Sequence, residues 1–287
     1  MTFQSFIMRQ RKAALALSAL FLTVAPAAAQ ETLRVGADVG FAPHVMAKPG
    51  GGYEGFNVDL IEAVGKRMGV KVEIVNVPYA GIFAAMDAGN ISFIIAPTTA
   101  NADRAAKVLV SEGYLNNDYR FIVRAGGLEI KSLEDLRGKT VAVNRGNSND
   151  VWLTAHEAQY GYKIARFGSN PDALQAVITG QADANLSGST VAAWVTKQTP
   201  QLKPSYVVAT GFTYTHPFKN GDTQLRDRFE RALECSKIDG TLAALYKKWF
   251  GEDAPANEAA LRAVVGSGEP GLAGYDPTPK PFDCSSK

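Results

Sequence analysis

The chain has 287 residues, with 30 Lys and Arg against 28 Asp and Glu, and 46% of its residues are hydrophobic. This near balance of charge, without a block or stripe of basic residues, argues against a nucleic-acid partner and against an anionic membrane surface. Two cysteines and three histidines, none at ligand spacing, give no support for a metal site, and we expect no cofactor. The chain also lacks a Gly-x-Ser-x-Gly elbow and a Gly-x-x-x-x-Gly-Lys phosphate loop.

The first 29 residues have the pattern of a secretory signal peptide. Arg9, Arg11 and Lys12 precede an apolar run over 13–25, and Ala27–Ala29 offers a small-residue cleavage site. An uncleaved anchor is the alternative, but the run is short for a bilayer span. Without the three basic residues, the chain keeps 27 Lys and Arg against 28 Asp and Glu. We therefore expect an exported, soluble chain of about 258 residues, enough for two lobes.

Strand and helix patterns alternate through the first part of this chain. The alternation predicts an α/β fold with a largely parallel sheet and helices on both faces. We expect strands at 33–37, 71–77, 91–97 and 119–124, and helices at 56–68, 82–88 and 102–107.

A second unit of the same kind follows. It opens at Ser132 with Asp135 three residues on, which matches a weak capping box. Expected strands lie at 140–143, 164–167, 184–187 and 206–209, and expected helices at 151–160, 171–179 and 191–199. Two terminal helices at 225–236 and 242–250 precede a Gly- and Pro-rich tail.

One segment carries the strongest functional signal. An apolar run from Phe93 leads into Pro97 and Thr99, and then into Arg104 at the expected start of a helix. Ligands of open α/β sheets bind at the carboxyl ends of the strands, where such a loop would lie. A guanidinium gives a carboxylate two parallel charge-assisted bonds. The segment therefore indicates a carboxylate site, although Arg104 could instead pair with Asp103 on the surface.

Several weak motifs share one order and spacing along residues 32–251. In that arrangement the chain resembles periplasmic solute-binding proteins of the polar amino acid ABC transporter type, bacterial extracellular solute-binding protein family 3. The motifs are Gly55-Phe56-Asn57-Val58-Asp59-Leu60, Thr99 with Arg104, Ser111-Glu112-Gly113-Tyr114, the segment from Ser132 to Lys139, Gly180-Gln181-Ala182-Asp183-Ala184, and Asp239-Gly240 before Lys248-Trp249-Phe250-Gly251.

This resemblance implies a two-lobed α/β fold, with two parallel-sheet lobes joined by two crossing strands and the ligand in the cleft between them. Lobe one would comprise residues 31–123 and 212–250, and lobe two residues 124–211. The crossings would fall near Val123-Arg124 and Gly211-Phe212, and residues 251–287 would form the tail. Lobes joined in this way close around a ligand by hinge motion, as is general for periplasmic binding proteins.

The resemblance also implies a ligand site. Phe41 and Tyr79 would form its aromatic walls, Thr99 would offer a hydroxyl and an N–H, and Arg104 would hold the carboxylate of the ligand. A turn of lobe two would add N–H groups at a helix start, where the dipole favours an anion. The expected ligand-binding residues are Asp38, Phe41, Tyr79, Pro97, Thr99, Arg104, Gly146, Asn147 and Ser148.

The chain departs from the family pattern at Gly188. The family usually has an aspartate there, eight residues after the glycine corresponding to Gly180, and that aspartate holds the α-ammonium of the ligand. Asp183 lies in the preceding segment and is expected to be structural. His44 and Ser92 replace a common aromatic and a common aspartate. Either another group holds the ammonium, or the ligand has none; the candidates are Asp38, Asp150 and Asn185.

On this basis we expect a monomeric periplasmic receptor, not an enzyme, that delivers an amino acid or related small carboxylate to an inner-membrane ABC permease. Two alternatives stay open. One is an accessory protein of a periplasmic oxidation system. The other is a dehydratase-like enzyme, for which His44 and Asp150 are the only acid–base candidates.

The two cysteines, Cys235 and Cys284, belong to a chain bound for an oxidising compartment. A disulfide between them is therefore expected in preference to two free thiols. It would hold the tail against the helix that contains Cys235.

Overall fold

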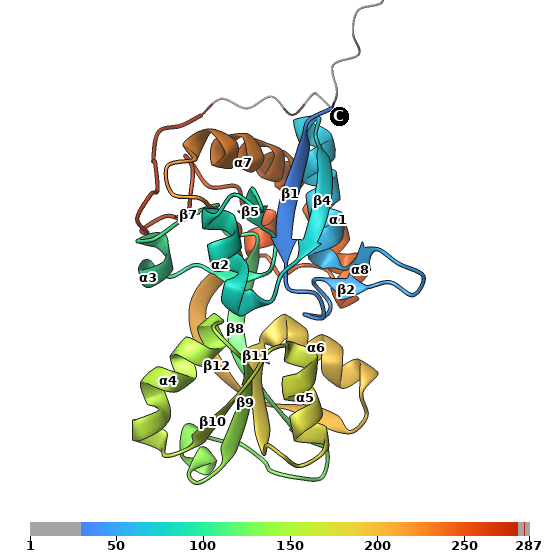
Figure 1. The fold of residues 1–287 in the computed structure, drawn as a ribbon, viewed down its shortest axis with the longest axis vertical. Helices are drawn as coiled ribbons and strands as arrows, with labels where there is room; N and C mark the ends of the chain where they lie inside the picture. Colours follow the sequence, from blue (N-terminus) through green and yellow to red (C-terminus); the bar gives the residue numbers. More distant parts are fainter. Residues whose placement is uncertain (1–29, 281–283, 285–287) are drawn as a thin grey trace, which may run out of the picture. The chain divides into compact units, whose positions relative to one another are not determined.

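Two large β-sheets, besides a small two-stranded one, organise the chain after residue 30 in the computed structural model, which describes residues 30–280 and Cys284 (Figure 1). The expected signal peptide lies outside the described residues. We call the part built on the five-stranded sheet lobe one, and the part built on the six-stranded sheet lobe two. Among the described residues, no helix is long and apolar enough to cross a membrane.

The sheet of lobe one has a parallel centre, because β1 pairs in parallel with both β4 and β5. The chain returns through β13, which runs antiparallel to β5 and β7. In sheet order the strands are β4 (Lys71–Asn76), β1 (Thr32–Ala37), β5 (Phe93–Ile94), β13 (Pro217–Phe218) and β7 (Leu109–Val110).

Helices cover both faces of this sheet, as the alternation of elements predicts. One apolar cluster joins the sheet to α1 (Phe56–Met68), α7 (Thr223–Ile238) and α8 (Thr241–Phe250). A second cluster joins it to α2 (Tyr79–Asp87), which also contacts β1 and β5. Successive side chains of β5 point to opposite faces of the sheet and are both buried: Phe93 packs in the first cluster and Ile94 in the second. This period of two is what a strand covered on both faces requires.

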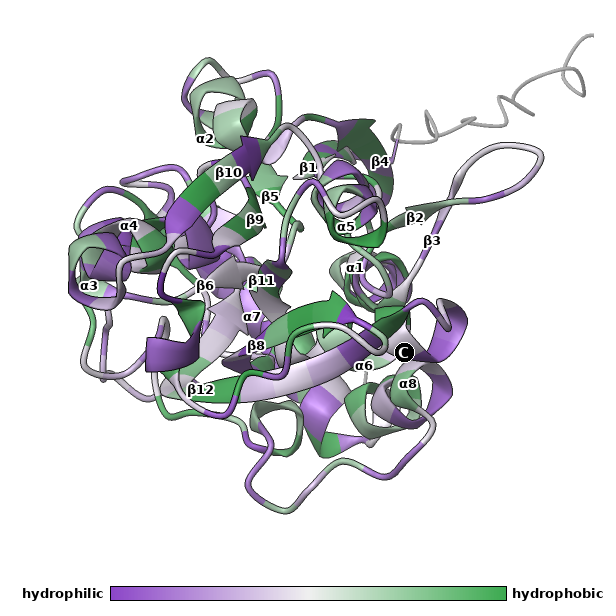
Figure 2. Cartoon of the chain, turned by 90° about the horizontal axis from the view of Figure 1, so that it is seen from below, coloured by the Kyte–Doolittle hydropathy of each residue, from purple (hydrophilic) through white to green (hydrophobic). Residues whose placement is uncertain are grey.

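The sheet of lobe two is built in the same way. Strand β9 is central to a parallel core with β10 and β11, and β8 and β12 add antiparallel strands. Helices α5 and α6 pack in one apolar cluster and α4 in the other. The elements are β10 (Lys163–Phe167), β9 (Thr140–Asn144), β11 (Ala184–Gly188), β8 (Leu115–Arg124), β12 (Leu202–Thr215), β6 (Thr98–Thr99), α4 (Ser148–Tyr160), α5 (Asn170–Ile178) and α6 (Ser189–Gln198). In Figure 2, β5 and β9 are coloured mainly as hydrophobic, as buried strands should be.

The chain passes between the two sheets along β8 and β12. Strand β7 ends at Val110 in the first sheet, and β8 begins at Leu115 in the second, ahead of the expected crossing. On the return, the register of β12 shifts between Val208 and Phe212, beside the other expected crossing. The last residues of β12 pair with β6 of the Pro97–Thr99 loop. The lobe boundaries given above stay a prediction.

Most predicted elements lie within a few residues of the observed ones, and α1 has the predicted bounds. The expected strand at 91–97 is shorter, because its apolar run turns after Ile94. The capping box is present, with Asp135 accepting from the N–H of Ser132 before a 3-10 turn, Leu133–Leu136. Patterning did not find the short strands β2 (Met46–Ala47), β3 (Tyr53–Glu54), β6, β7 and β13, and it gave α3 (Ala102–Ala105) two residues too many.

The C-terminal tail is fastened to lobe one, and the predicted disulfide between Cys235 and Cys284 is confirmed. Glu269 accepts hydrogen bonds from the N–H of Gly113 and the hydroxyl of Thr213. Glu258, before a 3-10 turn at Ala259–Leu261, accepts from the N–H of Asn116. The tail is therefore bonded to both chain segments that pass between the lobes.

We expect the Cys235→Ser/Cys284→Ser variant to keep its fold but to lose stability. The bridge closes a segment with a sequence separation of 49 residues, and the chain-entropy model assigns about 4 kcal/mol to such a loop. Urea unfolding measures the difference. Equal stability of variant and parent would contradict this role of the bridge.

Several charged side chains are buried where the tail meets α7. Lys237 Nζ lies 3.1 Å from Glu112 Oε1, and both side chains are almost fully buried. Burial raises the pKa of Glu230 to about 7. Burial, together with the nearby carboxylates of Glu112 and Glu230, raises the pKa of Glu234 to about 8. Glu234 therefore stays mostly protonated at pH 7, and a rise to pH 8 and above places negative charge in a poorly solvated cluster.

Replacement of Glu234 should change how stability depends on pH. Its pKa rises from an ordinary value of 4.5 to about 8 in the folded chain, so the folded state binds more protons between these values. The stability contributed by this group is full below pH 4.5 and is lost as the pH rises through 8. Glu234→Gln should remove the loss and gain on the order of 4 kcal/mol at pH 8. Thermal unfolding from pH 5 to 8 measures this, with exposed Glu62→Gln as the control. Parallel pH profiles for the two variants would contradict it.

Candidate functional site

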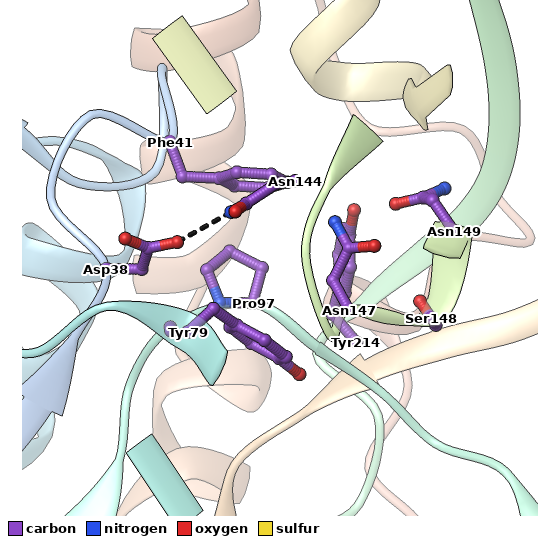
Figure 3. Close-up of a pocket in the computed structure, with 10 residues that line it drawn as sticks. Asp38, Phe41, Tyr79, Pro97, Asn144, Asn147, Ser148, Asn149 and Tyr214 are labelled. Carbon is purple, nitrogen blue, oxygen red and sulfur yellow. Dashed lines mark hydrogen bonds between the residues drawn. The ribbon is translucent and has the colours of Figure 1, made fainter. Parts of the chain in front are cut away.

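A small polar cavity lies where loops from both sheets meet (Figure 3). Lobe one contributes the loop after β1, the start of α2 and the residues after β5. Lobe two contributes the end of β9 and the first turn of α4, and the cavity also touches the end of β12. These are mostly carboxyl ends of parallel strands and the loops that follow them, where open α/β sheets bind ligands. The lining residues are Asp38, Phe41, Tyr79, Ala96, Pro97, Asn144, Asn147, Ser148, Asn149 and Tyr214.

Hydrogen bonds join the two lobes across this cavity. Asn144 Nδ2 donates to Asp38 Oδ2 at 2.7 Å, and the hydroxyls of Thr99 and Ser148 are 2.6 Å apart. The cavity volume is about 10 Å³, room for little more than one water molecule. A ligand the size of an amino acid can therefore enter only when the lobes separate.

Asp38 follows β1 and is 6% exposed. Burial raises the pKa of its carboxyl, while hydrogen bonds from Asn144 and from the backbone N–H of Tyr79 act in the opposite direction. The carboxylate therefore has two fixed donors but little solvent. Such a group would gain from a cationic partner in the cleft.

Phe41 and Tyr79, which were expected to form aromatic walls, both line the cavity. Tyr79 begins α2, and its hydroxyl donates to Thr98 Oγ1 at 3.3 Å. Phe41 belongs to lobe one in sequence, yet it packs in the apolar cluster of lobe two with Ile122 and Ala142. In Figure 3 the rings of Phe41 and Tyr79 lie on either side of Pro97 and Asn144. Phe41 therefore forms an apolar contact between the two lobes.

The expected turn of lobe two lies at the N-terminus of α4. Asn147 is the helix cap, and its side chain accepts from the N–H of Asp150. Gly146 lies outside the cavity lining, and its N–H donates to Asp150 Oδ2 at 2.9 Å. Asn149 lines the cavity, and its buried Nδ2 has no hydrogen-bond partner among the described residues. Asn147, Ser148 and Asn149 therefore present the donor side of the site.

Arg104 lies beside the cavity rather than in its lining. Its guanidinium donates to the carbonyl of Thr99 and lies 5.5 Å from the ring centre of Phe83. A guanidinium has five N–H donors, and the bond to Thr99 uses one of them. Asn101 caps the short helix α3 and accepts from the N–H of Arg104, which fixes the backbone there. The structure therefore brings Arg104 next to the contact between Thr99 and Ser148.

Four of the lining residues were not expected from the sequence, namely Ala96, Asn144, Asn149 and Tyr214. Asn144 ends strand β9, and Asn149 lies two residues beyond the helix cap, so both have a local signal: polar residues at a strand end and a helix start. Tyr214 has no such signal, because an aromatic residue within a strand usually packs in a core. It is placed at the cavity by the long return of β12.

The sequence model of bacterial extracellular solute-binding proteins, family 3, matches residues 33–252. The chain belongs to this family. The match spans both lobes and ends where the tail begins.

Relatives of known name agree with this membership. The L-arginine-binding protein of Pseudomonas aeruginosa is 26% identical over 84% of this chain and 95% of its own length. The solved structure of an ancestral arginine-binding protein bound to arginine is 33% identical, with a TM-score of 0.74 over 77% of this chain and 99% of its own. An ancestral amino acid-binding protein described as a precursor of cyclohexadienyl dehydratase is 32% identical, with a TM-score of 0.71 over 76% and 95%. The two-lobe binding fold is thereby confirmed.

A contact outside the cavity offers a test of how the lobes are held together. His44 Nε2 lies 2.9 Å from Thr190 Oγ1 of α6, and Thr190→Val would leave the fully buried imidazole without that partner. Loss of one buried hydrogen bond costs roughly 1 kcal/mol. Without ligand, the variant should show a larger mean radius of gyration by small-angle scattering.

Thr196→Val is the matched control, because among the described residues its hydroxyl bonds only within α6, to the carbonyl of Ala192 at 2.8 Å and that of Ala193 at 3.5 Å. Scattering curves of Thr190→Val that coincide with those of the control would show that this contact does not influence lobe closure.

Proposed function

We propose that this chain is a periplasmic receptor that captures an amino acid or a related small carboxylate between its lobes and presents it to an ABC permease of the inner membrane. The observation that carries the proposal is the cavity between lobe one and lobe two, lined by side chains from both. Because its walls meet through hydrogen bonds and through Phe41, a ligand would be enclosed by hinge motion.

The site has the parts that a small zwitterion needs. Asp38 offers a buried carboxylate for a cationic group, and Phe41 and Tyr79 offer apolar walls. For the carboxylate of the ligand, we assign Arg104 and Thr99 from lobe one and the first turn of α4 from lobe two. The dipole of this 13-residue helix favours an anion at that end. Relatives named for the binding of arginine support an amino acid.

An enzymatic role has less support from the two acid–base candidates. His44 is fully buried, and burial lowers its pKa to about 4; its ring nitrogens lie 3.0 Å from Asn57 Oδ1 and 2.9 Å from Thr190 Oγ1. Asp150 accepts from the N–H of Gly146 and pairs with Arg166 at 2.8 Å. Both side chains are engaged in structural contacts outside the cavity lining. We therefore retain a binding protein as the proposed function.

The first test is a ligand screen of the processed chain by thermal shift, followed by calorimetry with the twenty amino acids and small carboxylates. If Arg104 holds the carboxylate, Arg104→Ala should weaken binding at least about tenfold, since a charge-assisted hydrogen bond contributes roughly 1.5–3 kcal/mol. Arg104→Lys should also bind poorly, because a point charge cannot reproduce the fork of a guanidinium.

Exposed Lys107→Ala serves as the control for removal of a positive charge close to the same site. Near-wild-type affinity of Arg104→Ala would remove the assignment of the carboxylate clamp. Absence of binding by any small carboxylate would refute the proposed function itself.

A further inference from the structure

Tyr214, which lines the cavity, lies directly against Gly188 of lobe two. Tyr214 lies near the end of β12, where the chain returns toward lobe one; it is 3% exposed and packs its ring edge against His44. Gly188 ends β11 and caps α6 in lobe two. A Cβ atom at Gly188 would lie 2.1 Å from Tyr214 Oη and 2.9 Å from Asn117 Oδ1. No side chain fits at Gly188 while Tyr214 keeps this position.

Residue 188 must be glycine because of this contact, not because of its backbone conformation. Gly188 has φ −63° and ψ 150°, which any residue adopts readily. Tyr214 is wedged among buried rings, with Tyr114 stacked at 6.4 Å and His44 at 5.6 Å between ring centres, so its hydroxyl cannot move aside cheaply. The hydroxyl of Tyr214 therefore occupies the space that an acidic side chain at residue 188 would need.

Without an acidic side chain at residue 188, the cavity has one carboxylate fewer than the family pattern predicts. Asp38 is the one ionisable carboxyl among the described residues that line it, and the other polar groups are the neutral side chains of Tyr79, Asn144, Asn147, Ser148, Asn149 and Tyr214. Burial raises the pKa of Tyr214 well above its ordinary value, so its hydroxyl stays neutral. A second cationic group enclosed here would have no carboxylate to pair with, and an unpaired buried charge is costly.

We propose that Tyr214 is a specificity-determining residue that restricts the cleft to ligands with a single cationic group, which Asp38 receives, and an uncharged group beside Tyr214. This inference rests on the proposed function and narrows its substrate class. The favoured class is a zwitterion with one cation, such as an ω-guanidino or ω-amino acid or an amino acid with an uncharged side chain. Arginine, lysine and ornithine, which carry two cations, are disfavoured, unlike in the arginine-binding relatives.

Matched ligands test this in the wild-type chain. L-Arginine and 5-guanidinopentanoate differ by the α-ammonium alone, and so do L-lysine and 6-aminohexanoate. Calorimetry with both pairs and with the twenty amino acids should find a ligand with one cation as the tightest binder, at least about tenfold tighter than any dibasic amino acid. A dibasic amino acid that binds as tightly as every single-cation probe would overturn the inference and leave the proposed function in place. No binding by any of these ligands or by other small carboxylates would refute both.

A pair of double variants tests the part played by Tyr214. Tyr214→Phe removes the hydroxyl, and the nearest remaining ring atom would then lie 3.3 Å from a Cβ at residue 188. Asn117 Oδ1, 2.9 Å from the same Cβ, would still have to shift, and it has no hydrogen-bond partner among the described residues to hold it. Gly188→Asp/Tyr214→Phe should therefore place a carboxylate at the wall and shift the affinity ratio at least about tenfold toward L-arginine.

Gly188→Asn/Tyr214→Phe is the control, since it adds the same volume without charge and should not shift the ratio. An equal shift in both double variants would show that size rather than charge sets the preference, which would contradict the role of Tyr214. Circular dichroism establishes that each variant is folded. The wild-type comparison of matched ligands decides the inference even where a double variant does not fold.

Discussion

The pairing of β8 with β12 is the constraint on which the rest of the structure depends. Both strands extend the sheet of lobe two, and the chain reaches them from lobe one and returns to it through β13. The two lobes are thus joined by chain segments on one side only, while the cleft side is held by a few hydrogen bonds and by Phe41. Strong bonding along the strands and weak bonding across the cleft allow hinge motion without loss of either core.

The C-terminal tail also holds the segments that connect the two lobes. The family match ends at residue 252, yet Glu258 and Glu269 of the tail bind backbone N–H groups of Asn116 and Gly113. These carboxylates satisfy donors close to where the chain leaves lobe one for lobe two. The disulfide then fixes the end of the tail to α7 through Cys235. In this chain, the extension beyond the family fold therefore supports the segments about which the lobes would move.

Local patterns in the sequence were sufficient to predict the longer helices and strands, but not the short strands that form only by pairing with a distant part of the chain. The apolar spacing of α1 and the strand–helix alternation identified both parallel cores, since these depend on residues close in the chain. Short strands such as β6 and β13 carry two residues each and exist only because a distant strand lies beside them. The ligand site divides in the same way. Asp38, Phe41 and Tyr79, which were expected at the site, do line the cavity, whereas the strand-end residue Asn144 and the helix-start residue Asn149 were not named, and Tyr214 required knowledge of where β12 returns.

Gly188 shows why a missing residue can be as informative as a present one. From the sequence, its departure from the family pattern left open whether another acceptor replaces the aspartate or whether the ligand lacks the ammonium. The structure excludes a side chain at residue 188 itself, because Tyr214 Oη occupies the space that it would need. Among the other candidates, Asn185 donates to the carbonyl of Ala142 and Asp150 pairs with Arg166, so each is engaged within lobe two. Asp38 is then the one candidate that lines the cavity, and one carboxylate balances one cation. The ligand class that we propose thus rests on a steric contact made by a neutral residue.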